Sequence, residues 1–394
     1  MKVVFVSNFY NHHQAPFSEA MNELTKGQFR FVATKPIREE RLKMGWGGED
    51  TPDFVIKSYE SKENSDICQK LIDEADVVII GSAPKSLLNN RLKNKKLTFY
   101  YSERIYKKKP KLYIFLVWLV QNATRIMRHK NLYILCASAY TSADYAKTFT
   151  FLDKAYKWGY FTRLNSYDNV DEIINGKDPA SILWAGRFIN WKHPELALEV
   201  AERLIADGYD FKLKMIGTGV LEEHIKDLIE KKGLTNNVEM LGSMKPHEVR
   251  EHMEKSEIFL FTSDRNEGWG AVLNESMNSA CAVVAGHAIG SVPFLIEHGE
   301  NGLIYEDGNV EDLYNKVKWL LDHPEERAMM GKNAYKIMTE EWNAENAARK
   351  LLELADKLLN GEYKASPFKT GVCSKAERLS DSWFKTHHKK GMNV

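Results

Sequence analysis

The sequence is poor in cysteine and carries almost no net charge. Four cysteines occur among 394 residues, and two of them, Cys136 and Cys281, stand inside apolar runs where a small buried hydrophobe is expected. We therefore expect reduced core thiols in a cytoplasmic protein and no disulfide framework. The formal net charge of +1 provides no overall field for nucleic acid, so we predict no nucleic-acid partner.

Long apolar runs and two common motifs are also missing. No stretch reaches the roughly 18 apolar residues of a membrane-spanning helix, and the first residues lack the pattern of a secretory signal. No G-x-G-x-x-G follows the first predicted strand, which disfavours a dinucleotide-dependent oxidoreductase. No Asp-x-Asp occurs, so a metal clamp of that kind is not indicated.

Apolar segments of strand length alternate with amphipathic segments along the chain. The clearest apolar segments are VVFVSN, DVVIIGS, LTFYYSE and LYILCAS in the first half, and ILWAGR, FKLKMIG, VEMLGS, IFLFTS, CAVVAG and GLIYE in the second. This alternation predicts an α/β protein with parallel sheets, and the length favours two domains. We place the domains at 1–165 and 181–361, with a linker at 166–180 and a tail at 362–394 that packs back on the first domain.

A basic pair follows one of these predicted strands. Arg187 and Lys192 lie five positions apart just after ILWAG, where the carboxyl end of a parallel strand borders a binding crevice. A planar guanidinium and a mobile ammonium together suit a diphosphate. The alternative is a solvated basic loop before a helix that begins at Pro194.

The segment SDRNEGWGAVLNESM follows the predicted strand IFLFTS and leads into a helix. Gly268 and Gly270 let the backbone approach a ligand and leave amide groups at the helix start for an anion. Glu267 and Glu275, on roughly one face, can accept hydrogen bonds from sugar hydroxyls. The alternative is that Glu275 faces solvent and that Trp269 is core packing.

Two further strand ends carry glycine and small polar residues. These are IGTG at 216–219, with Gly217, and LGSM at 241–244, with Gly242 and Ser243. Such turns leave room for a base or a sugar against the backbone. Ordinary tight turns between a strand and a helix are the competing interpretation of both.

The stretch from about Ile182 to Leu303 resembles the donor domain of the retaining GT-B glycosyltransferases of glycosyltransferase family 4, the glycosyl transferases group 1. The resemblance rests on GRxxxxK at 186–192, on the E-x7-E pattern EGWGAVLNE and on HGENGL at 298–303. It implies two Rossmann-like, doubly wound parallel-sheet domains that face a cleft. It also implies transfer with retention of configuration, with neither metal nor cofactor.

The resemblance also implies residue roles. Arg187 and Lys192 would bind the donor diphosphate, Glu275 the ribose hydroxyls, and Glu267 the donor sugar near its reacting carbon. Backbone groups of the glycine turn would hold the phosphate and the sugar; these residues are Gly268, Trp269, Gly270 and Ala271.

The first half departs from the family pattern. Its first loop, SNFYNHHQAP, has no glycine pair, and we expect Asn11, His12 and His13 to bind the acceptor there. Adjacent histidines without a companion ligand are a poor metal site. The family histidine near the reacting sugar is missing from LTFYYSER, so Glu103 is the candidate replacement, with an ordinary salt-bridged residue as the alternative.

The second half departs once. Pro293 and Phe294 stand where many relatives have a glutamate, so contacts to the donor sugar at that point would rely on backbone and on Ser291.

Residues 104–130 contain no acidic side chain, and Lys and Arg flank an apolar centre that includes aromatic residues. This composition suits a helix lying on an anionic membrane surface. The alternative is a buried helix with solvated basic ends.

Together these features predict a metal-independent glycosyltransferase of the hexosyltransferase type. The donor would be a nucleotide-diphosphate sugar, with UDP favoured by family habit. The acceptor would be a glycan or a lipid-linked saccharide in cell-surface polysaccharide or glycolipid synthesis, reached in the cytoplasm or at the inner face of the membrane. The alternatives are a nucleotide-sugar epimerase or hydrolase on the same fold, and a catalytically silent nucleotide-binding partner protein.

Overall fold

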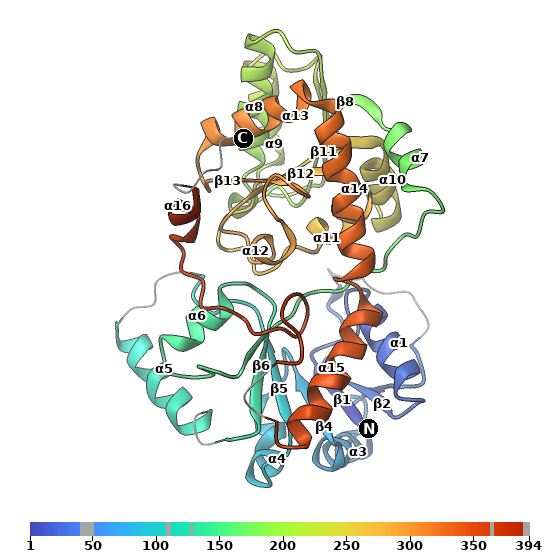
Figure 1. Ribbon diagram of the computed structural model, residues 1–394, viewed down its shortest axis with the longest axis vertical. Coiled ribbons are helices and arrows are strands. Elements are labelled where there is room, and N and C mark those ends of the chain that lie inside the picture. The colour runs from blue at the N-terminus through green and yellow to red at the C-terminus, as the bar shows by residue number, and fades with distance from the viewer. Residues whose placement is uncertain (40–50, 108–111, 127–128, 363–365, 389–394) are drawn as a thin grey trace. The chain divides into compact units, whose positions relative to one another are not determined.

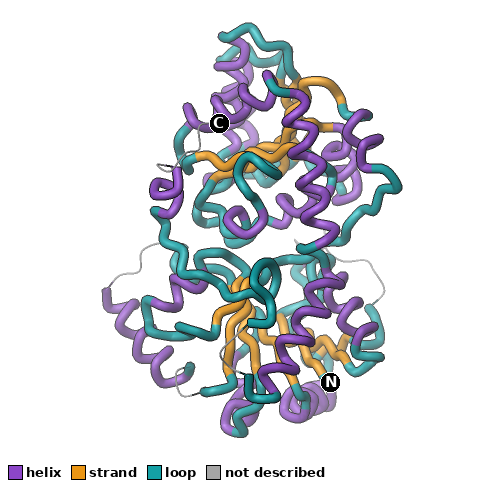
Figure 2. The backbone as a smooth tube through the Cα atoms, in the orientation of Figure 1, coloured by secondary structure: helices purple, strands orange, loops and turns teal. Residues whose placement is uncertain are grey.

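The computed structural model describes residues 1–39, 51–107, 112–126, 129–362 and 366–388. The chain forms two compact units. The first consists of Met1–Arg163 and Glu341–Ser380, and the second of Leu164–Glu340 and the residues from Asp381 onward. Each unit contains one parallel sheet with helices packed around it (Figures 1 and 2).

The sheet of the first unit has the strand order β3-β2-β1-β4-β5-β6-β7. Its strands are β1 (Val3–Ser7), β2 (Phe29–Ala33), β3 (Val55–Lys57), β4 (Val77–Ile80), β5 (Thr98–Ser102), β6 (Leu132–Cys136) and β7 (Ala155–Lys157). Residue Val3 of β1 lies between Phe29 of β2 and Val77 of β4, so the strand order reverses beside β1.

Helices cover both faces of this sheet, which explains why its central strands are apolar without alternation. The helices are α1 (Ala15–Leu24), α3 (Lys62–Glu74), α4 (Asn89–Lys93), α5 (Leu112–Arg125), α6 (Thr141–Ala146), α15 (Ala344–Leu359) and the 3-10 turn η1 (Lys85–Leu88). The core under them includes Val6, Ile80 and Ile134, which are fully buried.

The sheet of the second unit has the order β10-β9-β8-β11-β12-β13. Its strands are β8 (Asp178–Ala185), β9 (Lys212–Ile216), β10 (Val238–Gly242), β11 (Ser256–Phe261), β12 (Ala282–Gly286) and β13 (Leu303–Tyr305). Its helices are α7 (Val170–Asn175), η2 (Asn190–Lys192), α8 (Pro194–Ala206), α9 (Glu222–Lys231), α10 (Pro246–Lys255), α11 (Ala271–Asn278), α12 (Val292–Leu295), α13 (Val310–Asp322), α14 (Pro324–Glu340) and α16 (Trp383–His388). Every strand named in the sequence prediction is present, and the predicted α/β fold class is confirmed.

The unit boundaries differ from the domain boundaries predicted at 165, 180 and 361. The expected linker at 166–180 contains α7, which Asn169 caps by accepting a hydrogen bond from the amide of Asp171, and the start of β8. Helix α15 belongs to the first unit because its apolar face packs against α1. The tail is divided: Cys373–Lys375 pairs with β7, whereas the residues from Asp381 onward belong to the second unit.

All four cysteines are buried and free, as the apolar runs around Cys136 and Cys281 predicted. Strands β2, β3 and β7 were not predicted. They have three to five residues, and charged positions such as Arg30 and Lys57 interrupt them. Such short segments lack the periodicity that distinguishes a strand from a loop.

Gly331 of α14 packs closely against the turn that precedes β12. A Cβ atom at this position would lie 2.4 Å from the carbonyl oxygen of Ala280, which is backbone and cannot rotate away. We expect Gly331→Ala to lower the free energy of unfolding by about 1–3 kcal/mol, as overpacked cores do. Chemical denaturation measures this change. Lys336→Ala, an exposed site on the same helix, is the control, and an equal effect in both variants would contradict the packing argument.

Candidate functional site

The second sheet reverses its strand order between β8 and β11, which are neighbours. At such a point the loops that leave the two strands run in opposite directions and leave a crevice at the carboxyl ends. Hydrogen bonds join the two loops here. The amide of Asp264 donates to the carbonyl of Trp191 at 2.9 Å, and Thr262 Oγ1 donates to the carbonyl of Lys192 at 2.7 Å.

Two residues predicted for the site meet at this junction. Lys192 Nζ donates a hydrogen bond to Glu267 Oε2, and their side chains are only 14% and 16% exposed. Ser263 Oγ donates to the same carboxylate oxygen at 3.3 Å. Residues from distant parts of the chain therefore form one partly buried ion pair at the point where β8 and β11 end.

Arg187 is near but differently placed. Its side chain is exposed, and its guanidinium lies 5.6 Å from the centre of the Trp191 ring. Within the described ranges no carboxylate lies within ion-pair distance of Arg187, so its charge is available to an anion. This arrangement is compatible with binding of a phosphate.

His193 links the loop after β8 to the loop after β11. Its Nδ1 lies 2.7 Å from Glu195 Oε1, and its Nε2 lies 3.5 Å from Asp264 Oδ2. The hydrogen bond with Glu195 is the main reason why the pKa of His193 is raised. Asp264 in turn accepts from the amide of Asn266, so His193 helps to position the turn that carries Glu267.

The EGWG turn is held by its neighbours. Gly270 has φ +88°, and a Cβ atom there would lie 2.3 Å from the ring of Phe261. Trp269 is fully buried and donates from Nε1 to Asn274 Oδ1 at 2.8 Å, so its side chain packs in the core of the unit. Ser291 Oγ donates to the carbonyl of Trp269 at 2.6 Å and thus fixes the turn. Helix α11 begins at Ala271, immediately after it.

Glu275 has an unusual electrostatic environment. Desolvation raises the pKa of its carboxyl to about 7, and the nearby Arg250 opposes part of this effect. Arg250 donates to the main-chain carbonyl of Glu275 at 2.7 Å, and no hydrogen-bond donor reaches the carboxylate among the residues that the structure describes. A partly buried carboxylate without donors is a feature of ligand sites.

The two glycine turns lie side by side. The amide of Gly217 donates to the carbonyl of Gly242 at 2.7 Å, and Gly186 donates to the carbonyl of Ile216 at 2.9 Å. A Cβ atom at Gly217 would lie 1.8 Å from the carbonyl oxygen of Gly186, so the turn needs glycine to pack on the loop after β8. Ser243 is exposed beside this pair.

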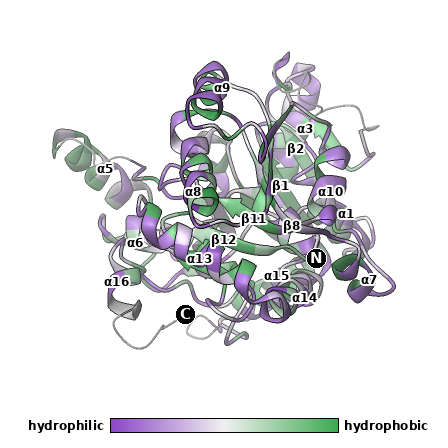
Figure 3. Ribbon diagram, turned by 90° about the horizontal axis from the view of Figure 1, so that it is seen from above, coloured by the Kyte–Doolittle hydropathy of each residue, from purple (hydrophilic) through white to green (hydrophobic). Residues whose placement is uncertain are grey.

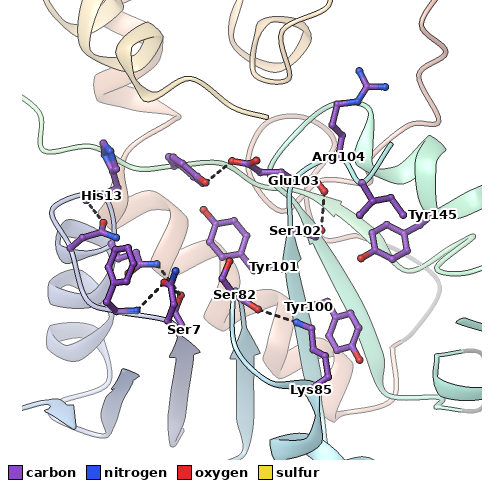
Figure 4. A pocket seen from close by; sticks show the side chains of 17 residues that line it. Ser7, His13, Ser82, Lys85, Tyr100, Tyr101, Ser102, Glu103, Arg104 and Tyr145 are labelled. Carbon is purple, nitrogen blue, oxygen red and sulfur yellow. Dashed lines mark hydrogen bonds between the residues drawn. The ribbon is translucent and has the colours of Figure 1, made fainter. Parts of the chain in front are cut away.

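The first unit has its own cavity where β1 and β4 end, again at the reversal of strand order (Figure 4). It has a volume of about 500 Å³. Asn11, His13 and Glu103 of the predicted acceptor-side residues line it, whereas His12 does not, although its ring lies 3.9 Å from that of His13. The structure thus brings together three of these four residues.

Glu103 contacts two residues at the edge of this cavity. Tyr160 donates its hydroxyl to Glu103 Oε1 at 2.6 Å, and Lys107 Nζ lies 3.3 Å from Oε2. The ring of Tyr160 stacks on that of His13 at 5.9 Å. Glu103 therefore forms a salt bridge, as the alternative of an ordinary salt-bridged residue predicts, and it also lines the cavity.

The sequence prediction missed Lys85 and Tyr160. Lys85 Nζ donates to the carbonyl of Gly81 at 3.0 Å and lies 4.4 Å from the centre of the Tyr100 ring. Desolvation lowers the pKa of this ammonium to about 8. The signal was present: GSAPK follows the predicted strand DVVII, and small residues after a strand often border a ligand site.

Helix α5 presents an apolar face to solvent. Its exposed residues are Leu112, Tyr113, Leu116, Val117 and Val120, which are between 49% and 74% exposed. Their spacing places them on one side of the helix. On the other side Trp118 packs against Tyr106 with ring centres 5.3 Å apart. Figure 1 shows α5 at the periphery of the first unit, and the hydropathy colours of Figure 3 show that much of this helix is hydrophobic.

Residues 108–111 and 127–128 of the basic segment at 104–130 lie outside the described residues. Among the helices that the structure describes, none combines the length and the hydropathy needed to cross a bilayer. Over the same residues, no group of three or more His, Cys, Asp or Glu side chains has the geometry of a metal site.

The two doubly wound sheets define a GT-B fold, as the sequence predicted. HepE of Anabaena, solved in complex with UDP, has the same fold, with a TM-score of 0.67 and 14% identity over 91% of this chain and 100% of that one. Residues 168–337 match the family model of the glycosyl transferases group 1.

Curated relatives match the same half of the chain. An uncharacterized glycosyltransferase of Methanocaldococcus jannaschii is 30% identical over 165 residues, which are 42% of this chain and 45% of the relative. A putative colanic acid biosynthesis glycosyltransferase of Salmonella typhimurium is 25% identical over 183 residues, or 45% of each chain. The matches thus span about half the length of these relatives.

Glu275 makes the stability of the protein depend on pH. Because its folded pKa of about 7 lies above the ordinary 4.5, the folded state holds the proton more tightly than the unfolded state. Its contribution to the free energy of unfolding therefore falls as the pH rises from about 4.5 to about 7. We expect Glu275→Gln to flatten this dependence in thermal unfolding measured across that range. The exposed Glu326→Gln is the control, and identical pH profiles for Glu275→Gln and the parent protein would refute the assignment.

Proposed function

We propose that this protein is a retaining, metal-independent hexosyltransferase of glycosyltransferase family 4, which transfers a sugar from a UDP-linked donor to a glycan or lipid-linked saccharide. The observation that carries the proposal is the ion pair between Lys192 and Glu267 at the reversal point of the second sheet. The family match of residues 168–337 supports the reaction class. The complex of HepE with UDP supports the nucleotide, through the shared fold.

Donor binding begins with the two cations. Arg187 and Lys192 bind the diphosphate, and the phosphate oxygens replace Glu267 as the partner of Lys192. The released carboxylate of Glu267 then accepts a hydrogen bond from a hydroxyl of the donor sugar near the reacting carbon. Amides at the start of α11, after Gly268 and Gly270, add positive potential for the phosphate.

Glu275 completes the donor site by accepting hydrogen bonds from the ribose hydroxyls. Its carboxylate has no donor among the described residues, so these hydroxyls supply the bonds that the free protein lacks. The base of the donor nucleotide lies against the backbone of the turns at Gly217 and Gly242, beside Ser243. No step needs a bound metal, because the cationic pair stabilises the charge on the leaving diphosphate.

The chemical step is a substitution on one face of the sugar. The acceptor oxygen bonds to the reacting carbon while the bond from that carbon to the diphosphate breaks. The acceptor proton passes to an oxygen of the leaving phosphate, so UDP departs and the configuration is retained. Glu103, held by Tyr160, orients the acceptor hydroxyl together with Asn11 and His13, and His12 contributes only through its contact with the ring of His13.

Nucleotide binding tests the donor site. We expect UDP to raise the thermal midpoint of the protein, since a ligand at a hundred times its Kd stabilises the folded state by about 2.7 kcal/mol. Lys192→Ala removes one phosphate contact, so the affinity for UDP should fall roughly tenfold. Glu267→Gln should keep UDP binding but slow sugar transfer by roughly 10² to 10³.

Lys231→Ala, an exposed lysine of α9, is the matched control for charge. The absence of any UDP shift, or full transfer by Glu267→Gln, would overturn the proposal. Incubation of the donor alone separates the two alternatives: rapid release of free sugar indicates a hydrolase, and conversion to an isomeric donor indicates an epimerase. Unchanged cellular function of Glu267→Gln indicates a catalytically silent partner.

We further propose that α5 rests on the cytoplasmic face of an anionic membrane, from which a lipid-linked acceptor would reach the site. The exposed apolar face supplies the hydrophobic contact. The segment around it, residues 104–130, has basic residues and no acidic one, which suits anionic lipid.

Vesicle sedimentation tests this surface. We expect the protein to bind vesicles that contain phosphatidylglycerol and to bind pure phosphatidylcholine poorly. Leu116→Glu with Val120→Glu should weaken binding at least tenfold, because each leucine-sized contact contributes about 1.5–3 kcal/mol. Met329→Glu, an exposed apolar residue of α14, is the control. Equal loss in the control, or dimerisation through α5 in solution, would refute the membrane assignment.

A further inference from the structure

Lys85 contributes a positive charge to the lining of the cavity of the first unit. The residue follows β4 after the short loop 81–84, beside the point where the strand order reverses, and begins the turn η1. Its ammonium lies over the ring of Tyr100 at 4.4 Å and donates one hydrogen bond, to the carbonyl of Gly81. An ammonium has three N–H donors, so two of them remain for another partner.

No carboxylate compensates this charge. Among the described residues, no Asp or Glu lies within ion-pair distance of Lys85, and the one acidic residue of the cavity lining, Glu103, pairs with Lys107 and Tyr160 instead. The other strong cation of the lining, Arg104, already faces Asp144, with Nε 3.7 Å from Oδ2. The ammonium of Lys85, an exposed residue of the cavity lining, is therefore left without a carboxylate partner among the described residues.

The two contacts of Lys85 within the protein, one hydrogen bond to a carbonyl and one aromatic face, leave its positive charge without an anionic partner among the described residues. Desolvation alone lowers the pKa of Lys85 to about 8, and no nearby charge shifts it further. A negative group of a ligand would supply what is missing.

We propose that the cavity of the first unit selects an acceptor saccharide that carries an anionic group, a carboxylate or a phosphate, which binds Lys85. The inference rests on the proposed function and specifies its acceptor class. The cavity, of about 500 Å³, lies within the range of small-molecule sites.

The remaining lining determines how the acceptor would lie. Figure 4 shows Lys85 and Glu103 on opposite sides of the cavity, with Tyr101 between them. An acceptor whose anionic group contacts Lys85 places a hydroxyl toward Glu103, which accepts hydrogen bonds and repels a second anion. The two charged residues therefore fix the direction of the acceptor as well as its charge.

Direct binding of small probes to the full chain tests this selectivity without any donor. We would measure glucuronate, glucose 1-phosphate and the neutral methyl glucoside by calorimetry or ligand-observed NMR. We expect at least one anionic probe to bind about tenfold more tightly than methyl glucoside, and Lys85→Gln to abolish this preference. Lys85→Arg, which keeps the charge, should retain most of it, and Lys93→Gln, an exposed lysine of α4, should change nothing.

The two anionic probes distinguish which group of the acceptor carries the negative charge. Preference for glucuronate indicates an acidic sugar. Preference for glucose 1-phosphate indicates a phosphorylated or lipid-diphosphate acceptor. Equal binding of charged and neutral probes, an unaltered preference in Lys85→Gln, or no binding of either anion overturns the inference. The UDP-induced thermal shift of the same samples reports the donor site independently. A normal shift without anion selectivity rejects only the present inference, and a missing shift rejects the proposed function.

Discussion

Both units depend on the same constraint: in a parallel sheet all strands end at one edge, and a reversal of strand order leaves that edge uncovered at one point. In the first sheet the reversal lies between β1 and β4, and in the second between β8 and β11. The cavity with Lys85 and the ion pair of Lys192 with Glu267 occupy these two points. The backbone topology thus determines where ligands can bind, and the side chains determine which ligands these are.

The chemistry of the two points differs in how charge is compensated. In the second unit Lys192 has Glu267 as its partner, so the free protein avoids the cost of an isolated charge. A diphosphate, with several negative oxygens, can compete for Lys192 and also bind Arg187, whereas a neutral sugar cannot. Under the proposed function, the ion pair favours donors with phosphate groups and keeps Glu267 close to the position where the reaction requires it.

Rigid backbone surrounds the proposed donor site. Gly217, Gly219 and Gly270 each lie so close to neighbouring atoms that no Cβ fits, and His193 holds Asp264 at the base of the EGWG turn. Such support limits the freedom of the loops before a ligand binds, and a site that is already ordered loses less entropy on binding. The same glycines have a packing role, so their presence alone does not identify a ligand.

The sequence by itself determined the fold class and indicated the donor side of the proposed site. Apolar segments of regular spacing predicted the central strands because parallel strands are buried on both faces, and E-x7-E with GRxxxxK indicated the donor side. The sequence did not determine the unit boundaries. The apolar face of α15 can be recognised in the sequence, but only the packing of this helix against α1 shows that it belongs to the first unit.

The tertiary structure alone decided which side chains meet. Lys192 and Glu267 are 75 positions apart, and Glu103 and Tyr160 are 57 apart, so their contacts follow from strand order and from no local pattern. Lys85 could be read from the sequence as an ordinary surface lysine. The proposed role depends on the fold, which places Tyr100 and Gly81 beside Lys85 and, within the described part of the chain, no carboxylate at ion-pair distance, because the energy of a charge depends on its neighbours in space.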